Sequence, residues 1–300
     1  MKKKNLNRIR RTTEDRVVDT VIYILLAIVF FICAYPFWYG LVLSLNDSVD
    51  TARGGMYFWP RVWTLDNYLK FFRDDTWLRA FLVSVARTLC GSVITTVFTM
   101  LVSYGLSHEK LVFRKAYMSI IIFSMYFSGG LIPFYVLLKN LGLLNSFLVY
   151  IIPPALNTFF IFIAITFFND IPEALKESAK LDGATEMRIF RSIIMPISLP
   201  LMVTILLFSA VGQWNAWFDS AFYVTNKQLR TLGYMLMETI NQANVPSNAV
   251  AAAQAAASAK VDPLAVRVTA MMISVIPILA IYPFLQKYFV TGLTIGSVKG

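Results

Sequence analysis

Six long stretches of this sequence contain no Lys, Arg, Asp or Glu and consist mainly of apolar residues. They are residues 20–46, 88–108, 116–138, 140–169, 192–218 and 268–286. An α-helix that crosses the hydrocarbon core of a bilayer needs about 20 mostly apolar residues. The sequence therefore predicts an all-α integral membrane protein with six transmembrane helices, at about 20–45, 81–106, 116–138, 147–168, 198–222 and 267–289.

The composition agrees with a membrane location and argues against several other classes of protein. Of the 300 residues, 57% are hydrophobic and 15% are charged, which is too apolar a balance for a soluble globule. Two cysteines exclude a disulfide framework, and a single histidine leaves little for a metal site. The net charge of +10 is diluted by apolar sequence, so it indicates membrane orientation rather than nucleic-acid binding.

A seventh charge-free stretch, residues 239–259, differs from the other six. It contains Asn, Gln and Pro and has no run of large aliphatic residues. Its second half, together with Lys260, spans 248–260 and is rich in alanine, the strongest helix former. We therefore expect an extramembrane helix in a loop here.

Basic residues set the expected orientation. Cytoplasmic segments carry an excess of Lys and Arg, and seven of these residues precede the first apolar stretch: Lys2, Lys3, Lys4, Arg8, Arg10, Arg11 and Arg16. That stretch is too long for the apolar region of a signal peptide, so it is interpreted as an uncleaved anchor. The basic segment 1–16 is then cytoplasmic, the transmembrane domain spans 17–290, and an even number of spans makes the tail 291–300 cytoplasmic too. The loops 46–80 and 223–266 face outward.

The motifs of several enzyme classes are missing from the sequence. There is no G-x-x-x-x-G-K-[ST] phosphate loop, no H-E-x-x-H and no G-x-S-x-G. The sequence therefore predicts a chain that is not an enzyme and does not hydrolyse ATP by itself. Ionisable residues are nearly absent from the spans, which disfavours an ion-coupled carrier. A secondary transporter or channel for a small polar solute remains the alternative.

Two charged residues lie near the outer ends of predicted spans, Arg87 and Asp219. A charge exposed to hydrocarbon is costly, so we expect both side chains to face the protein interior and to form a pair. Asp219 also belongs to a polar and aromatic patch with Trp214, Asn215 and Trp217. These residues and Arg87 are candidates for lining a transport pathway, although an aromatic belt at the membrane interface is the more ordinary explanation of the patch.

Residues 169–197 form a polar loop with signals for two short helices. Pro172 suits a first helical turn, and Glu173 favours the positive end of a helix. Gly183 predicts a left-handed helix C-cap, and Thr185 can cap a second helix. The apolar residues of that second helix recur at helical spacing: Met187, Phe190 and Ile194. From spacing alone, a solvated helical loop is as plausible as an element that docks on a partner.

The same loop resembles the EAA motif of permease subunits in ABC importers. Glu177-Ser178-Ala179 is followed by Gly183 and Ile193, and then by Met195-Pro196. Two residues depart from the motif: Ser178 replaces Ala, and Met195 replaces Leu. The string EALKESAKLDGAT and the outer segment from Trp59 to Tyr68 are similar to the sugar-importer branch, in particular to the maltose-type second permease and to permeases for complex oligosaccharides.

This resemblance implies a type I ABC importer permease fold with cytoplasmic coupling helices, in a bacterial cytoplasmic membrane. It implies a function in ATP-driven import of sugars, with oligosaccharides as the expected substrates. The implied partners are a second homologous permease, a cytoplasmic ATPase dimer that binds ATP and Mg, and an extracellular or periplasmic sugar-binding protein that meets the 223–266 loop. No cofactor is expected on this chain. The residues implied to couple to the ATPase are Glu173, Glu177, Ser178, Ala179, Asp182, Gly183, Ile193 and Pro196.

Overall fold

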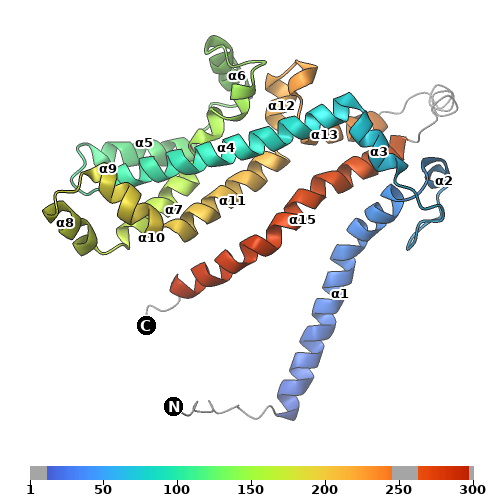
Figure 1. Ribbon diagram of the computed structural model, residues 1–300, viewed down its shortest axis with the longest axis horizontal. Coiled ribbons are helices and arrows are strands. Elements are labelled where there is room, and N and C mark those ends of the chain that lie inside the picture. The colour runs from blue at the N-terminus through green and yellow to red at the C-terminus, as the bar shows by residue number, and fades with distance from the viewer. Residues whose placement is uncertain (1–11, 245–262, 297–300) are drawn as a thin grey trace. The chain divides into compact units, whose positions relative to one another are not determined.

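The computed structural model describes residues 12–244 and 263–296 (Figure 1). These residues form helices and connecting loops, apart from one isolated antiparallel bridge between Asn46 and Trp63. The chain divides into two units. Unit 1 contains residues 1–70 and 248–272, and unit 2 contains residues 71–247 and 273–300. The predicted extramembrane helix at 248–260 falls in 245–262, outside the described residues.

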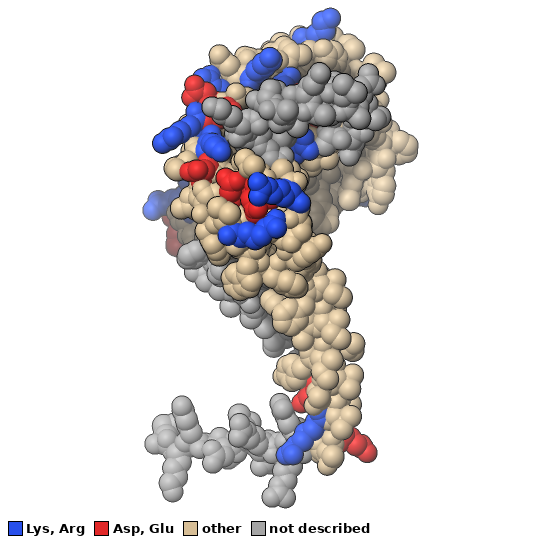
Figure 2. All heavy atoms as spheres, turned by 90° about the vertical axis from the view of Figure 1, so that its right-hand side faces the viewer, with Lys and Arg blue, Asp and Glu red and all other residues tan. Residues whose placement is uncertain are grey.

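Unit 1 begins with the long helix α1, Thr13–Ser44. Thr12 and Asp15 cap its start reciprocally through side-chain and main-chain hydrogen bonds. After Asp19 no charged residue interrupts the helix, and the residues that follow are almost all apolar. Figure 2 shows this helix as a surface without Lys, Arg, Asp or Glu beyond its first turns. A helix that is apolar on all sides suits a lipid environment.

The chain that follows α1 folds back on its end through buried amide side chains. Asn46 is fully buried, its Nδ2 donates to Asp50 and Thr51, and its Oδ1 accepts from the Val62 N–H. The Asn67 side chain donates to the main-chain oxygens of Ser44 and Asn46. These hydrogen bonds hold the segment that contains the short helix α2, Ser48–Ala52, against the end of α1. Helix α3, Asp66–Arg73, leads on to unit 2.

Unit 2 is built along helix α4, Asp75–Ser107, which packs against α7, Thr158–Asn169, and α11, Leu199–Asn215 (Figure 1). The buried face of α4 carries small polar residues, which let membrane helices approach closely and bond across the interface. The Thr95 hydroxyl donates to the Pro154 carbonyl 3.0 Å away, and Ser103 donates to the Ile161 carbonyl. Helix α4 is therefore the central element of the unit.

Glycine and proline break two of the predicted spans. In place of one helix at 116–138, α5, Arg114–Tyr126, is separated from α6, Leu131–Asn140, by an extended segment that ends at Gly130 with φ +82°. In place of one helix at 147–168, the 3₁₀ turns η1, Phe147–Tyr150, and η2, Pro153–Ala155, precede α7 at a bend of 43°. Proline removes a main-chain donor and glycine permits positive φ, so these are the expected places for a break.

The chain also bends sharply before α11. Helix α9, Glu186–Ile189, continues through the π-turn η3, Phe190–Ile194, into α10, Met195–Ile197. Pro196 lacks the N–H that a regular turn requires, and a π-turn accommodates such a residue. The axis then turns by 79° into α11. The predicted span 198–222 is broken once more at Ala216, after which α12, Phe218–Tyr223, begins.

By length and composition, the described residues contain two helices able to cross a membrane, α1 and α4, or up to four spans if each bent pair is one span. The structure is thus an all-helical membrane fold, and the count of six spans remains a prediction. Helix α15, Pro263–Gly296, continues past Pro277 and Pro283 and beyond the predicted end at 289. Residues 291–296 of the expected tail are therefore part of this helix.

A buried apolar cluster joins the turn of the 169–197 loop to the end of α4. It includes Met100 and Tyr104 of α4, Phe168 of α7 and Ile189 of α9. Helix α8, Glu173–Leu181, adds Ala179 to the same cluster. Packing against this cluster therefore fixes the position of the 169–197 loop, in addition to its covalent connections to α7 and α11.

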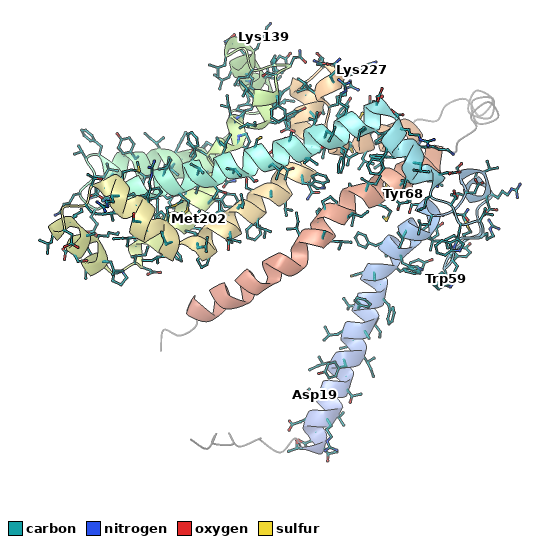
Figure 3. All side chains as sticks on the ribbon, viewed as in Figure 1. Asp19, Trp59, Tyr68, Lys139, Met202 and Lys227 are labelled. Atoms are coloured by element: carbon teal, nitrogen blue, oxygen red, sulfur yellow. The ribbon has the colours of Figure 1, made fainter. Side chains whose placement is uncertain are left out.

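The opposite end of unit 2 is closed by hydrogen bonds between loops. The Asn145 side chain accepts from the main-chain N–H groups of Thr225 and Asn226, and the Asn145 N–H donates to the Tyr223 carbonyl. The turn η4, Lys227–Leu229, and helix α13, Leu232–Asn244, follow. Figure 3 shows Lys139 and Lys227 projecting at this end of the unit, away from Met202.

Truncating Phe168 tests the apolar cluster. Its side chain is fully buried and stands edge-on to Tyr104. Because Phe168→Ala leaves a cavity among α4, α7 and α9, we expect it to lower the free energy of unfolding in detergent by roughly 3–5 kcal/mol. Phe159→Ala, on the same helix but 54% exposed, is the matched control and should have a much smaller effect. Equal losses for the two variants would contradict the assignment of this core.

Candidate functional site

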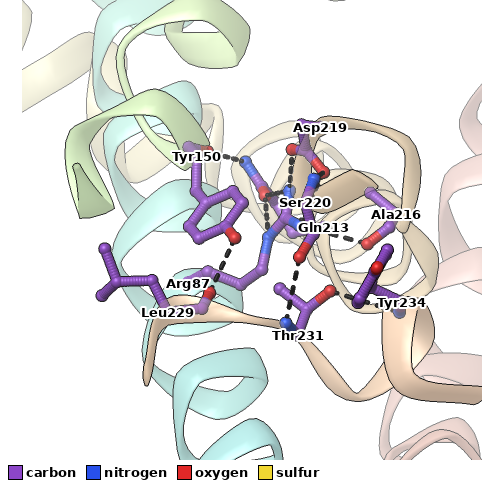
Figure 4. Close-up of polar contacts among 9 residues, drawn as sticks. All are labelled: Arg87, Tyr150, Gln213, Ala216, Asp219, Ser220, Leu229, Thr231 and Tyr234. Atoms are coloured by element: carbon purple, nitrogen blue, oxygen red, sulfur yellow. Dashed lines mark hydrogen bonds and ion pairs between the residues drawn. The ribbon is translucent and has the colours of Figure 1, made fainter. Parts of the chain in front are cut away.

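A buried arginine organises the end of unit 2 away from the 169–197 loop. Arg87 of α4 is only 2% exposed, and its guanidinium donates five hydrogen bonds (Figure 4). Two go to the Gln213 Oε1, at 3.1 and 2.9 Å, and one goes to the Ala216 carbonyl, at 3.1 Å. The remaining two form a forked ion pair with the Asp219 carboxylate. Each of the three guanidinium nitrogens therefore has an acceptor.

The acceptors come from three successive parts of the chain. Gln213 lies in the last turn of α11, and Asp219 lies in the first turn of α12. Between these helices Ala216 adopts an extended conformation with ψ 121°, so its carbonyl leaves the helical direction and meets Arg87. The break in the predicted span 198–222 is thus the feature that supplies an acceptor to a buried cation. The predicted interior pairing of Arg87 with Asp219 is confirmed.

Gly91 allows α4 and α11 to meet closely enough for this arrangement. A Cβ atom at this position would lie 2.5 Å from the Gln213 Nε2 and 2.7 Å from its Cδ. The Gln213 amide is also held from the other side, because its Nε2 donates to the Tyr150 carbonyl at 3.1 Å. The Tyr150 ring lies 4.4 Å from the guanidinium carbon of Arg87, a cation–π distance.

A pocket of about 380 Å³ opens beside this centre. Arg87, Gln213 and Asp219 form part of its wall, and Asn157 and Ser209 add further polar groups. The rest of the lining is largely aromatic and apolar: Phe134, Phe160, Phe208, Phe218, Tyr223, Pro153 and Pro154. Aromatic faces with a few fixed polar groups are typical of small-molecule sites.

The residues of the predicted pathway patch separate in the structure. Arg87 and Asp219 line the pocket. Trp214 points elsewhere, since its indole N–H donates to the Ser274 carbonyl at 2.8 Å and its ring meets Phe81 edge-on. Asn215 and Trp217 are exposed and do not line the pocket. The sequence analysis did not select Gln213. A polar amide within the apolar stretch 192–218 was nevertheless a sign that this side chain has a polar partner.

At the other end of unit 2, Gly183 closes helix α8 with φ +76°, which confirms the predicted left-handed cap. The Ala184 N–H donates to the Ala179 carbonyl, and the Gly183 N–H donates to the Lys180 carbonyl. This bonding pattern is a Schellman motif. Thr185 then caps α9 by accepting from the Arg188 N–H, also as predicted.

The residues of the EAA motif face in two directions. Glu173, Glu177, Ser178, Asp182 and Gly183 are exposed, as is Pro196. Ala179 is buried and Ile193 is half-buried, and both pack against the chain's own apolar cluster. Leu181, at the tip of α8, is 89% exposed. The outward surface of the turn thus combines carboxylates with an exposed leucine, while Ala179 supports it from inside.

Glu186 is a second residue that the sequence analysis missed. Its carboxylate forms an ion pair with Lys180 at 2.7 Å, accepts from the Tyr104 hydroxyl at 3.0 Å, and lies 3.3 Å from the His108 Nε2. The hydrogen bond from Lys180 holds the pKa of Glu186 below its ordinary value, and the same bond raises the pKa of Lys180. Nothing local signalled these contacts, because Tyr104 and His108 lie about 80 residues earlier.

No group of three or more His, Cys, Asp or Glu side chains within residues 12–244 and 263–296 could hold a metal ion.

A double-mutant cycle tests the coupling between Arg87 and Asp219. Arg87→Leu leaves the Asp219 carboxylate without its cation, and breaking such a pair costs roughly 3 kcal/mol or more. Arg87→Leu combined with Asp219→Asn removes both charges, so we expect it to be more stable than Arg87→Leu alone. Thermal unfolding in detergent measures the difference, and strictly additive losses would argue against a coupled pair.

Substitution of Gly91 tests the close approach of α4 and α11. Gly91→Ala should displace the Gln213 amide and lower the unfolding temperature. Gly105→Ala, on the same helix, meets no atom within 4 Å and should be neutral or stabilising by up to about 1 kcal/mol, the helix propensity gain. The two variants should thus differ clearly in thermal stability. A neutral Gly91→Ala would show that the close approach is not required.

Comparison with known proteins places these features in a family. Residues 7–295 match the model of the binding-protein-dependent transport system inner membrane component. Protein LplC of Bacillus subtilis (strain 168) is 35% identical over 98% of this chain and 99% of its own length. The polygalacturonan/rhamnogalacturonan transport system permease protein YtcP of the same organism is 34% identical over 96% and 100%.

A solved structure agrees with these sequence matches. A bacterial ABC transporter involved in the import of the acidic polysaccharide alginate contains a chain that superposes with a TM-score of 0.84 at 27% identity. The match covers 93% of this chain and 98% of that one. The family match, the relatives and the fold thus coincide over nearly the whole chain, and the protein belongs to the family of inner membrane permease components of binding-protein-dependent ABC transport systems.

Proposed function

We propose that this chain is the permease of an ATP-driven importer of oligosaccharides. The observation that carries the proposal is the arrangement of unit 2 about α4. An exposed, Schellman-closed turn lies at one end of this helix, and an aromatic pocket beside Arg87 lies toward the other. Several relatives are named as permeases for sugar polymers or oligosaccharides, including YtcP, the arabinooligosaccharide permease AraQ and the melibiose/raffinose/stachyose permease MelC.

The chain contributes motion and access, while ATP hydrolysis belongs to a partner subunit of the importer. We infer that the ATPase receives the outward surface of α8 and its turn: Glu173, Glu177, Leu181, Asp182 and Gly183. Closure of two ATPase subunits around ATP would move this turn, and the helices would alternate between inward-open and outward-open packings as rigid bodies. Ala179 takes no direct part in docking, because it is buried against the chain's own core.

The pocket suits a sugar ring better than an ion. Sugar rings present apolar faces that stack on aromatic side chains, and their hydroxyl groups bond to polar groups such as the Asn157 amide. Arg87 is held in the wall by its own acceptors, so it shapes the pocket rather than binding substrate. A second, homologous permease would supply the other wall of the pathway, since one chain carries one coupling turn and a two-ATPase motor needs two.

The membrane topology is part of the proposal. We infer six spans at the predicted positions, with residues 1–16 and 291–300 in the cytoplasm. The cytoplasmic location of 169–197 follows, and the loop 223–266 then faces the sugar-binding protein outside. The basic residues before α1 support this orientation. The breaks at Gly130, Pro153 and Ala216 support a pathway between broken helices, where irregular backbone can line a cavity.

Gly183 provides the test. Gly183→Val forces a β-branched residue into the left-handed region, at a cost of about 1–2 kcal/mol, and should distort the docking turn. We expect weaker co-purification of the ATPase and slower uptake of labelled oligosaccharides, with normal membrane insertion. Gly183→Asn, which tolerates this conformation, should retain both functions to a greater degree.

Gly142 is the matched control. It has φ +68°, and a Cβ added to it would meet no atom within 4 Å, as is also true of Gly183. It follows α6, however, away from the 169–197 loop. Gly142→Val should leave ATPase association unchanged. Normal ATPase binding together with normal uptake in a well-inserted Gly183→Val variant would overturn the coupling assignment.

A further inference from the structure

The carboxylate of Glu186 stands where three parts of unit 2 meet. Lys180 belongs to the last turn of α8, Glu186 begins α9, and Tyr104 and His108 lie one turn apart at the end of α4. One carboxylate therefore contacts both the proposed ATPase-docking helix and the helix that carries Arg87. It joins α8 to α4 through polar side chains, in addition to the apolar cluster that Ala179 of α8 and Tyr104 of α4 share.

The partners on α4 are themselves held in place. The Tyr104 and His108 rings meet edge to face with centroids 4.7 Å apart, and the His108 Nδ1 lies 2.8 Å from the Tyr104 carbonyl. The Tyr104 ring is buried against Phe168 and Phe190. Glu186 thus contacts a rigid part of α4.

The contribution of this cluster to folding stability is expected to be small. The side chains of Glu186 and Lys180 are 52% and 49% exposed, and exposed ion pairs add little to stability. Removing the carboxylate should therefore leave folding and ATPase docking largely intact. A large effect on transport would then report a role in transmitting motion.

We propose that Glu186 is the positioning residue that transmits movement of the coupling helix α8 to α4. The proposal rests on the function proposed above. When the ATPase moves α8, the Lys180–Glu186 pair carries α9 with it, and the bond to Tyr104 transfers the displacement to the end of α4. Since α4 is unbroken from Asp75 to Ser107, the displacement reaches the Arg87 centre and the pocket wall.

The test follows the pocket and the ATPase separately, in the full complex purified with its ATPase and second permease. Cys33 and Cys90 are exposed and are first replaced by Ser. Ser209, which lines the pocket, is changed to Cys, and its labelling by a maleimide is timed with and without MgATP plus vanadate. In this background we expect trapping to change the labelling rate by about fivefold or more, the lower range of coupling between sites.

Variants at the Glu186 contact then separate transmission from assembly. Glu186→Ala should keep ATPase co-purification and vanadate trapping but abolish the change in Ser209→Cys labelling. The reversed pair Lys180→Glu with Glu186→Lys restores opposite charges, and the Tyr104 hydroxyl can accept as well as donate, so it should recover part of the change. Lys176→Met removes a positive charge one turn earlier on α8 and is the matched control.

Each outcome has a definite meaning. Retention of the full labelling change in Glu186→Ala would overturn the transmission role, as would loss of ATPase co-purification in that variant, since docking would then be its function. Equal impairment by Lys176→Met would also overturn it. Failure of the proposed function looks different, because the parent complex would then co-purify with no ATPase and show no ATP-dependent labelling change.

Discussion

A buried guanidinium sets the structure of one end of unit 2. A charged group within a membrane domain is costly unless it is paired and fully hydrogen-bonded. Arg87 meets this requirement with acceptors from Gln213, Ala216 and Asp219. Each acceptor imposes a local condition. Gln213 requires a residue without a side chain at Gly91, and the Ala216 carbonyl requires that the helix be interrupted.

The broken helices of unit 2 depend on the one that is not broken. Main-chain groups released by a break have no water to bond with inside a membrane and need partners within the protein. Helix α4 supplies several of them. Thr95 donates to the Pro154 carbonyl at the 43° bend, and Arg87 donates to the Ala216 carbonyl after α11. The polar residues of α4 therefore explain how its neighbours can depart from regular helix.

A continuous helix beside interrupted helices suits the function of a permease, which must link ATPase movement to a substrate pathway. Helix α4 extends about 1.5 Å per residue, so its 33 residues can connect the loop that we propose faces the ATPase with the pocket near the other end. The interrupted helices provide the irregular wall that a substrate pathway needs. The two polar clusters, around Arg87 and around Glu186, are both attached to α4 and differ in burial. The first fixes the pocket wall, and the second joins α4 to the turn that we propose moves.

The sequence by itself determined the membrane class, the helical turn at 169–197 with its left-handed glycine, and the need for Arg87 and Asp219 to face the protein interior. These features depend on local periodicity, on the backbone freedom of Gly183, and on the cost of a charge in lipid. Only the tertiary structure decided which way Ala179 faces and which groups complete the polar clusters. Arg87 and Gln213 are 126 residues apart, and their meeting depends on the register between α4 and α11. No local pattern encodes that register, because it is set by the packing of Gly91 and its neighbours across the helix interface.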